Sequence, residues 1–185
     1  MAKQLDQVLV IDVEATCWED KPPEGQQSEI IEIGVAIVAT KEKSLVHKEG
    51  IIIKPEYSEV SPFCTSLTTL TPEMVASGVS FKDACKRLRK EFMSQQCTWV
   101  SYGDYDRRQF ERDCREKKVG YPFGTTHLNV KNLLALMYGW EREVGMATAL
   151  EQLQLPLEGT HHRGIDDAWN IAKLFVHLLE CFQKG

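Results

Sequence analysis

The sequence lacks any long apolar run, and no segment has the ~18 consecutive apolar residues that a membrane span needs. The first residues also lack the apolar stretch of a secretory signal, so we predict neither a signal peptide nor a membrane span. None of the six cysteines forms a C-x-x-C pair. Their scatter through apolar segments predicts buried, reduced thiols. These absences together indicate a cytoplasmic protein.

Positive charge is also scarce, because 22 Lys and Arg residues stand against 27 Asp and Glu residues. Coating a long nucleic acid by charge alone needs many Lys and Arg contacts to phosphates. The net charge of −5 therefore argues against that class of binding, but it allows the binding of a few nucleotides through metal ions. The chain has 185 residues, 43% of them hydrophobic, which predicts one domain over residues 1–185.

Strand signals come early in the chain and helix signals come late. The predicted strands are residues 7–14, 29–40, 45–54, 98–102 and 127–130. The predicted helices are residues 81–92, 104–118, 131–138, 146–153 and 164–182. Short connections between the first three strands favour antiparallel pairing. The whole order indicates an α/β fold in which helices cover a mixed sheet.

Two acids, Asp12 and Glu14, directly follow the apolar run "VLVI" and so stand at the end of a predicted buried strand. Residues two apart on a strand share a face, about 6–7 Å apart, so the two carboxylates project together. Neighbouring carboxylates repel each other, and an unpaired buried charge costs several kcal/mol. A hard divalent cation such as Mg²⁺ would resolve both problems. A solvated strand end or a shared proton is the alternative.

An acid also stands near the start of two predicted helices. Asp167 lies on an otherwise apolar face of the last helix and should point inward, whereas Asp166 shares a polar face with Asn170 and should face water. By the same spacing, Asp106 leans towards the core. Each acid alone could simply complement the helix dipole. Together with the strand pair they give four convergent carboxylates, which suit two cations about 3.5–4 Å apart in phosphodiester cleavage.

Two histidines, His161 and His162, precede the last helix. A histidine with a pKa near neutrality can act as general base on a metal-bound water. A histidine in a loop is alternatively only a surface residue. The pair could also indicate zinc, but no cysteine or further histidine stands at ligand spacing.

These motifs, in this order, resemble the DEDDh 3′→5′ exonucleases of the DnaQ-like, ribonuclease-H-like superfamily. The stretches that resemble its Eri-like branch, with the three-prime histone mRNA exonucleases and KapD-type proteins, are "DVEATCW", "EIIEIG", "FCTSLTTLT", "YGDYDRRQF", "ALEQLQL" and "HHRGIDDAWNIA". The resemblance covers about residues 8–173. It implies a ribonuclease-H-like α/β fold with a five-stranded mixed sheet, its first three strands antiparallel, flanked by helices.

The resemblance also implies a reaction and its residues. The implied catalytic set is Asp12, Glu14, Asp106, His162 and Asp167. The four acids would hold two Mg²⁺ or Mn²⁺ ions, and His162 would deprotonate the attacking water. The partner would be a single-stranded 3′ end, RNA in preference to DNA, from which nucleoside 5′-monophosphates are released. A DNA proofreading or repair exonuclease, and a non-catalytic partner module that keeps the fold, are the alternatives. Protein partners and oligomeric state stay open, with a monomer allowed.

A pocket for the terminal nucleotide is implied as well. Its predicted residues are Glu14, Ala15, Thr16, Cys17, Trp18, Leu67, Thr68, Thr71 and His162. Apolar and aromatic groups there could stack on a base without reading its identity, and core packing is the alternative role for Trp18 and Leu67. Thr69 replaces a glycine that is usual in this branch, which predicts a different pocket lip if that glycine adopts a positive φ.

Overall fold

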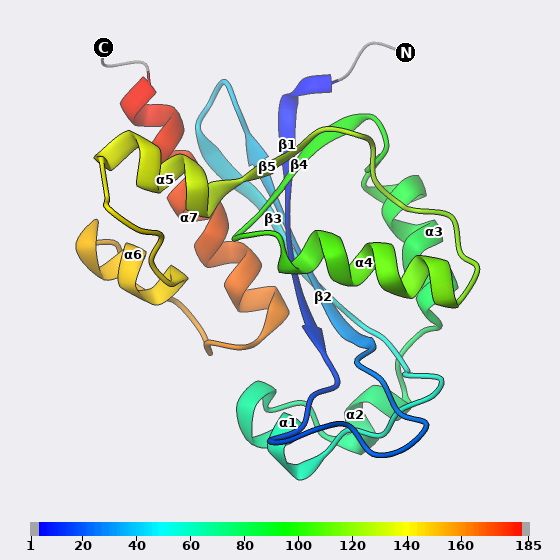
Figure 1. Ribbon diagram of the computed structural model, residues 1–185. Helices are drawn as coiled ribbons and strands as arrows, with labels where there is room; N and C mark the ends of the chain where they lie inside the picture. Colours follow the sequence, from blue (N-terminus) through cyan, green and yellow to red (C-terminus); the bar gives the residue numbers. More distant parts are fainter. Residues whose placement is uncertain (1–3, 183–185) are drawn as a thin grey trace.

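A computed structural model describes residues 4–182 and is built on a five-stranded mixed sheet (Figure 1). The strands are β1 (Gln4–Ala15), β2 (Ile30–Ala39), β3 (Ser44–Ile52), β4 (Cys97–Ser101) and β5 (His127–Asn129). They lie in the order β3-β2-β1-β4-β5. The first three strands pair antiparallel, whereas β4 and β5 are parallel to β1. The predicted mixed sheet and its antiparallel start are confirmed.

The helices are α1 (Pro62–Thr68), α2 (Pro72–Ala76), α3 (Phe81–Glu91), α4 (Tyr105–Glu116), α5 (Val130–Tyr138), α6 (Met146–Gln152) and α7 (Gly164–Phe182). Helical periodicity in the sequence predicts neither α1 nor α2, because seven and five residues are too few to show it. Local signals are nevertheless present. Ser61 and Thr71 cap the two helices with their hydroxyl groups, and a proline follows each cap.

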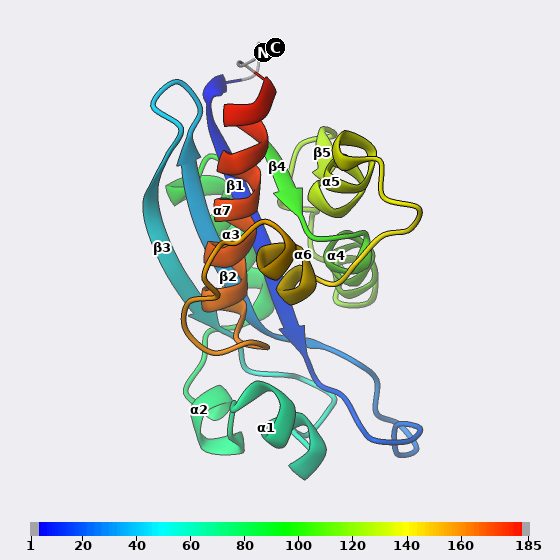
Figure 2. The same cartoon turned by 90° about the vertical axis from the view of Figure 1, so that its left-hand side faces the viewer.

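Alternation along β1 divides the core into two layers. Leu9 and Ile11 pack in one cluster with α3 and α4, whereas Val8 and Val10 pack in another with α5, α6 and α7. Figures 1 and 2 show the two groups of helices on opposite faces of the sheet. A central strand covered on both faces therefore accounts for the apolar run before Asp12. The next even-numbered positions of β1 carry the two acids towards the α7 side.

The first turn of α7 is held close to β2 by two glycines. A Cβ atom on Gly34 would lie 1.7 Å from the carbonyl oxygen of Gly164, so no side chain fits there. Because β2 pairs with β1 directly, with Asp12 opposite Gly34, this approach sets the start of α7 beside the end of β1. Among residues 4–182, no helix combines the length and apolarity that crossing a membrane would require.

The polar face predicted for α7 is wrong in part. Asn170 is fully buried, and its amide group exchanges hydrogen bonds with the backbone of Glu158. Asp166 is only half-buried, and its carboxylate pairs with Lys48 of β3 at 2.5 Å. The helical spacing correctly separated Asp166 from Asp167, but it could not show that the segment before α7 and strand β3 cover this face.

Candidate active site

A cavity of about 420 Å³ opens where β1 ends. Its lining residues are Asp12, Val13, Glu14, Ala15, Cys17, Leu67, Tyr102, Tyr105, Asp106, Gly145, Met146, His161, His162 and Asp167. The residues come from β1, α1, α4, α6 and α7, from the segment directly after β1, and from the loops before α4, α6 and α7. The four acids singled out in the sequence therefore meet in one cavity, although they are spread over more than 150 positions of the chain.

Three elements bring the carboxylates together. Asp12 and Glu14 stand at the end of β1, and Asp167 stands in the first turn of α7. One carboxylate oxygen from each of these three acids lies within 4.8 Å of the others. Asp106, in the first turn of α4, accepts a hydrogen bond from the backbone N–H of Val13 at 2.9 Å. This bond fixes α4 against β1 between the two strand acids.

The crowding of negative charge shows in the acid–base behaviour of the four groups. Burial raises the pKa of Asp12 well above its usual range, and the charges of Asp106 and Glu14 add to the effect. Burial and the charge of Asp167 raise the pKa of Glu14 to about 8. Burial raises the pKa of Asp106 to about 7 and also raises that of Asp167. Carboxyl groups whose pKa values are raised in this way would be stabilised in their ionised form by hard divalent cations, so the cluster fits such ions.

Both histidines reach the cavity, and they play different parts there. Their rings stack with centroids 4.0 Å apart. The Nδ1 atom of His161 lies 3.1 Å from each carboxylate oxygen of Asp167, whereas His162 donates its backbone N–H to the same carboxylate at 2.9 Å. His162 has a left-handed φ of 65°. The resemblance selected His162 as general base, and that choice stays a prediction.

The structure brings part of the predicted nucleotide pocket into the cavity. Glu14, Ala15, Cys17, Leu67 and His162 line the cavity, whereas Thr16, Trp18, Thr68 and Thr71 do not. The hydroxyl group of Thr16 bonds to the backbone of Gln27 and Glu29, and that of Thr68 donates to a carbonyl of α1. Thr71 caps α2. A threonine in the motif therefore serves the fold when its hydroxyl group already has a backbone partner.

Five residues line the cavity that the sequence did not point to, namely Val13, Tyr102, Tyr105, Gly145 and Met146. Tyr102 is anchored by a hydrogen bond from its hydroxyl group to the carbonyl of Val144 at 2.9 Å. Tyr105 is 57% exposed, which is high for a large aromatic side chain. Its place directly before the inward acid of α4 was a usable signal. Gly145 and Met146 belong to a separate segment, and no pattern in the sequence joins them to the acids.

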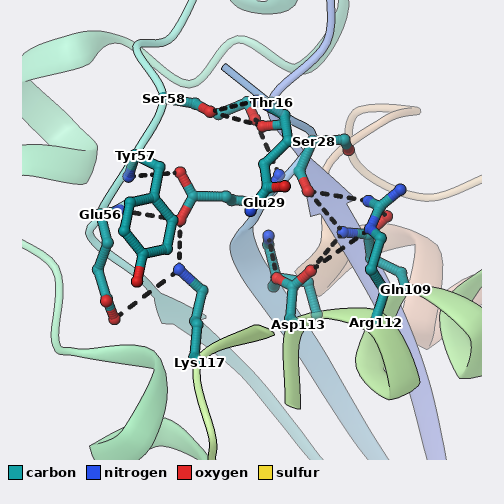
Figure 3. Close-up of polar contacts among 12 residues, drawn as sticks. Thr16, Ser28, Glu29, Glu56, Tyr57, Ser58, Gln109, Arg112, Asp113 and Lys117 are labelled. Carbon is teal, nitrogen blue, oxygen red and sulfur yellow. Dashed lines mark hydrogen bonds and ion pairs between the residues drawn. The ribbon is translucent and has the colours of Figure 1, made fainter. Parts of the chain in front are cut away.

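A buried polar network holds α4 in place behind the cavity (Figure 3). Glu29 accepts hydrogen bonds from the backbone N–H groups of Glu56 and Tyr57 and from the ammonium group of Lys117. Burial alone would raise the pKa of Glu29, but these bonds lower it. Asp113 of α4 accepts from the N–H of Ile30 at the start of β2. The network thus ties α4, and with it Asp106, to the sheet.

An exonuclease family model (RNase T) matches residues 9–175. The "3′-5′ exoribonuclease 1" of Homo sapiens is 29% identical over 185 residues, which cover 95% of this chain and 53% of that protein. The "Probable 3′-5′ exonuclease KapD" of Bacillus subtilis is 26% identical over 170 residues, which cover 91% of this chain and 82% of that protein. The chain thus spans about half the length of the human relative.

Solved structures agree with this similarity. The nuclease domain of 3′hExo, described as a DEDDh family member and solved bound to rAMP, superposes with a TM-score of 0.83 at 27% identity. The superposition covers 97% of this chain and 95% of that domain. The structure described as 3′-end specific recognition of the histone mRNA stem-loop by 3′-exonuclease superposes with a TM-score of 0.80 at 26% identity. It covers 95% of this chain and 82% of that chain.

Proposed function

We infer the reaction of this protein from its family, because the chain belongs to the exonuclease family that its sequence resembles. We propose that it hydrolyses phosphodiester bonds from single-stranded 3′ ends and releases nucleoside 5′-monophosphates. The observation that carries the proposal is the meeting of four carboxylates from three elements in one cavity. No residue of the implied catalytic set is missing from that cavity, which argues against a non-catalytic partner module.

Members of this family depend on divalent metal, and the donor set of the cavity fits such ions. We propose that Asp12, Glu14, Asp106 and Asp167 hold two Mg²⁺ or Mn²⁺ ions. When bound, the ions would neutralise the charge of the scissile phosphate and lower the pKa of the attacking water. The ionised acids would then balance the positive charge in place of repelling one another.

The remaining residues have roles that follow from their chemistry. Burial and the neighbouring His161 lower the pKa of His162, which keeps its ring neutral near pH 7 and able to accept a proton from the attacking water. Leu67 of α1 and Tyr105 of α4 would contact the terminal base through apolar and aromatic surface. Contacts of this kind are tolerant of base identity, so we expect little sequence preference.

We propose RNA as the substrate in preference to DNA. The human relative is named an exoribonuclease, and the similar nuclease domain was solved bound to rAMP.

We also propose a cytoplasmic setting, which the six free cysteines support, because reducing conditions keep thiols free.

A side-by-side degradation assay tests the proposal. Matched oligonucleotides, each labelled at the 5′ end, would be offered as single-stranded RNA, single-stranded DNA and a duplex with a 3′ overhang, with Mg²⁺ or Mn²⁺. We expect stepwise shortening of the RNA from its 3′ end, 5′-monophosphate products, and a complete stop with EDTA. A variant with Asp12→Asn and Asp167→Asn controls for a contaminating nuclease. If bound metal can be demonstrated but no oligonucleotide is cleaved, the chain acts as a partner module.

A further inference from the structure

Glu32 is a buried acid beside the cavity that the proposed reaction does not use. It lies on β2 directly opposite Glu14, with a side chain only 1% exposed. Its carboxylate accepts the backbone N–H of Gly164 at 2.8 Å. It also accepts two bonds from Arg163, from Nε at 3.2 Å and from Nη2 at 3.1 Å. This two-bond pair fastens the start of α7 to the sheet.

The same guanidinium group reaches a third element. Its Nη1 atom donates to the hydroxyl oxygen of Thr69 at 3.3 Å. Thr69 ends α1 with a φ of 63°, a left-handed conformation that disfavours β-branched residues and in which glycine is the usual choice. Leu67, two residues earlier, lines the cavity. The strained threonine therefore supplies a hydroxyl group that a glycine could not.

Arg163 consequently connects two walls of the cavity. One wall is Leu67 of α1, which Arg163 reaches through Thr69. The other is His162, the residue directly before Arg163. We propose that Arg163 is a positioning residue that, through Thr69, sets the distance between these walls and so the width of the nucleotide cavity. The proposal rests on the proposed exonuclease function, because it names the group that shapes the site of that reaction.

The hydrogen bond from Arg163 to Thr69, called the clamp below, can be removed by substitution without breaking the buried pair of Arg163 and Glu32. Thr69→Ala removes the acceptor but leaves Arg163 on Glu32, and Thr69→Ser keeps the acceptor. Arg163→Lys keeps a positive charge for Glu32, but a single ammonium group lacks the planar fork that serves both partners at once. Ser66→Ala is a matched control, because the hydroxyl group of Ser66 bonds only within α1, to the carbonyl of Phe63.

The first test is the kinetics of 3′-end cleavage on an oligoribonucleotide. One hydrogen bond of this kind corresponds to a two- to tenfold effect, so Thr69→Ala should raise KM by about that factor. The kcat value should stay the same, because contact with the base wall is equal in the ground state and the transition state. Thr69→Ser and Ser66→Ala should match the unmodified protein. Equal KM values for Thr69→Ala and the unmodified protein would overturn the proposal.

Two further variants separate positioning from plain structural support. Thr69→Gly relieves the left-handed strain, so its melting temperature should not fall while its KM rises as in Thr69→Ala. In an Arg163→Lys background, Thr69→Ala should have no added effect on KM, because the bond is already lost. Additive effects of the two substitutions would contradict a shared contact.

Hydrogen exchange gives a readout that needs no activity. Backbone amides of residues 63–70 should exchange faster in Thr69→Ala and Arg163→Lys than in the unmodified protein or Ser66→Ala. If this difference appears while the unmodified protein cleaves no oligonucleotide, the clamp exists and the proposed function fails. If cleavage is normal but neither exchange nor KM changes in the two variants, the clamp proposal fails and the exonuclease function stands.

Discussion

Removal of divalent cations should make this protein less stable as the pH rises. The pKa of Glu14 moves from 4.5 to about 8 in the folded protein, because the side chain is buried and faces the charge of Asp167. Between these two pH values the folded chain binds a proton at Glu14 that the unfolded chain has lost. The free energy of unfolding therefore falls with rising pH across this window, and Asp106 acts in the same direction up to about pH 7.

The expected size of the effect is large. A tenfold change in proton affinity corresponds to about 1.4 kcal/mol, so Glu14 alone contributes a loss of roughly 5 kcal/mol between its two pKa values. The four acids repel one another, so their contributions do not add, and we expect a total of several kcal/mol. Because domains of this size have a free energy of unfolding of about 5–15 kcal/mol, the metal-free protein should be only marginally stable at pH 8.

Urea unfolding in EDTA at pH 5, 6.5 and 8 measures this directly. The midpoint should fall steadily with pH, and millimolar Mg²⁺ should flatten or reverse the trend, because the ions bind the ionised carboxylates. Glu14→Gln should reduce the slope, whereas Glu151→Gln, at an exposed position, should leave it unchanged. A midpoint that rises with pH in EDTA, or a slope untouched by Glu14→Gln, would refute the convergence of charge in the cavity.

Three further outcomes follow from the site. Asp167→Asn should lower kcat by about a thousandfold, because a cation that stabilises the reacting phosphate is worth several kcal/mol. Asp166→Asn should largely spare kcat and lose only an ion pair worth about 1 kcal/mol in the free energy of unfolding. The reverse ranking in a cleavage assay would contradict the assigned faces of α7. His162→Ala should slow turnover by about a hundredfold or more. Its metal affinity, measured by calorimetric titration beside the matched variant His161→Ala, should stay nearly intact. A parallel loss of metal affinity would make His162 a ligand. Lys117→Met should lower the free energy of unfolding in urea by about 3–5 kcal/mol, because it leaves a buried carboxylate without its cation, and an unchanged midpoint would count against the network behind α4.

Strong periodic signals were sufficient to predict the frame of the site. The alternation of β1 placed Asp12 and Glu14 on one face, and the structure brings both into the cavity. The predicted bounds of the last helix coincide with those of α7, because nineteen residues show the helical period clearly. In both cases a repeating pattern of burial, spread over several turns or residue pairs, fixed the direction of each side chain.

Direction alone could not identify what each side chain meets. Asn170 was expected in water, because the helical phase of α7 gives no information about the segment around Glu158 that covers it. The two histidines lie in a loop without any period, so no physical pattern could tell which ring would approach Asp167. The motif spacing selects His162, whereas the contact between side chains belongs to His161.

Glu32 shows how an acid that supports the fold differs from the acids of the proposed metal site. The alternation that singled out Asp12 in the sequence applies equally to the stretch "EIIEIG". There Glu32 interrupts an apolar strand and points to the α7 side. Its charge is balanced by Arg163 within the chain. Within residues 4–182, by contrast, no ion pair joins Asp12 or Glu14 to a basic side chain. Glu32 is a buried acid with its own cation and holds the fold together, whereas the half-buried Asp12 and Glu14 converge without one and fit positive charge from outside the chain.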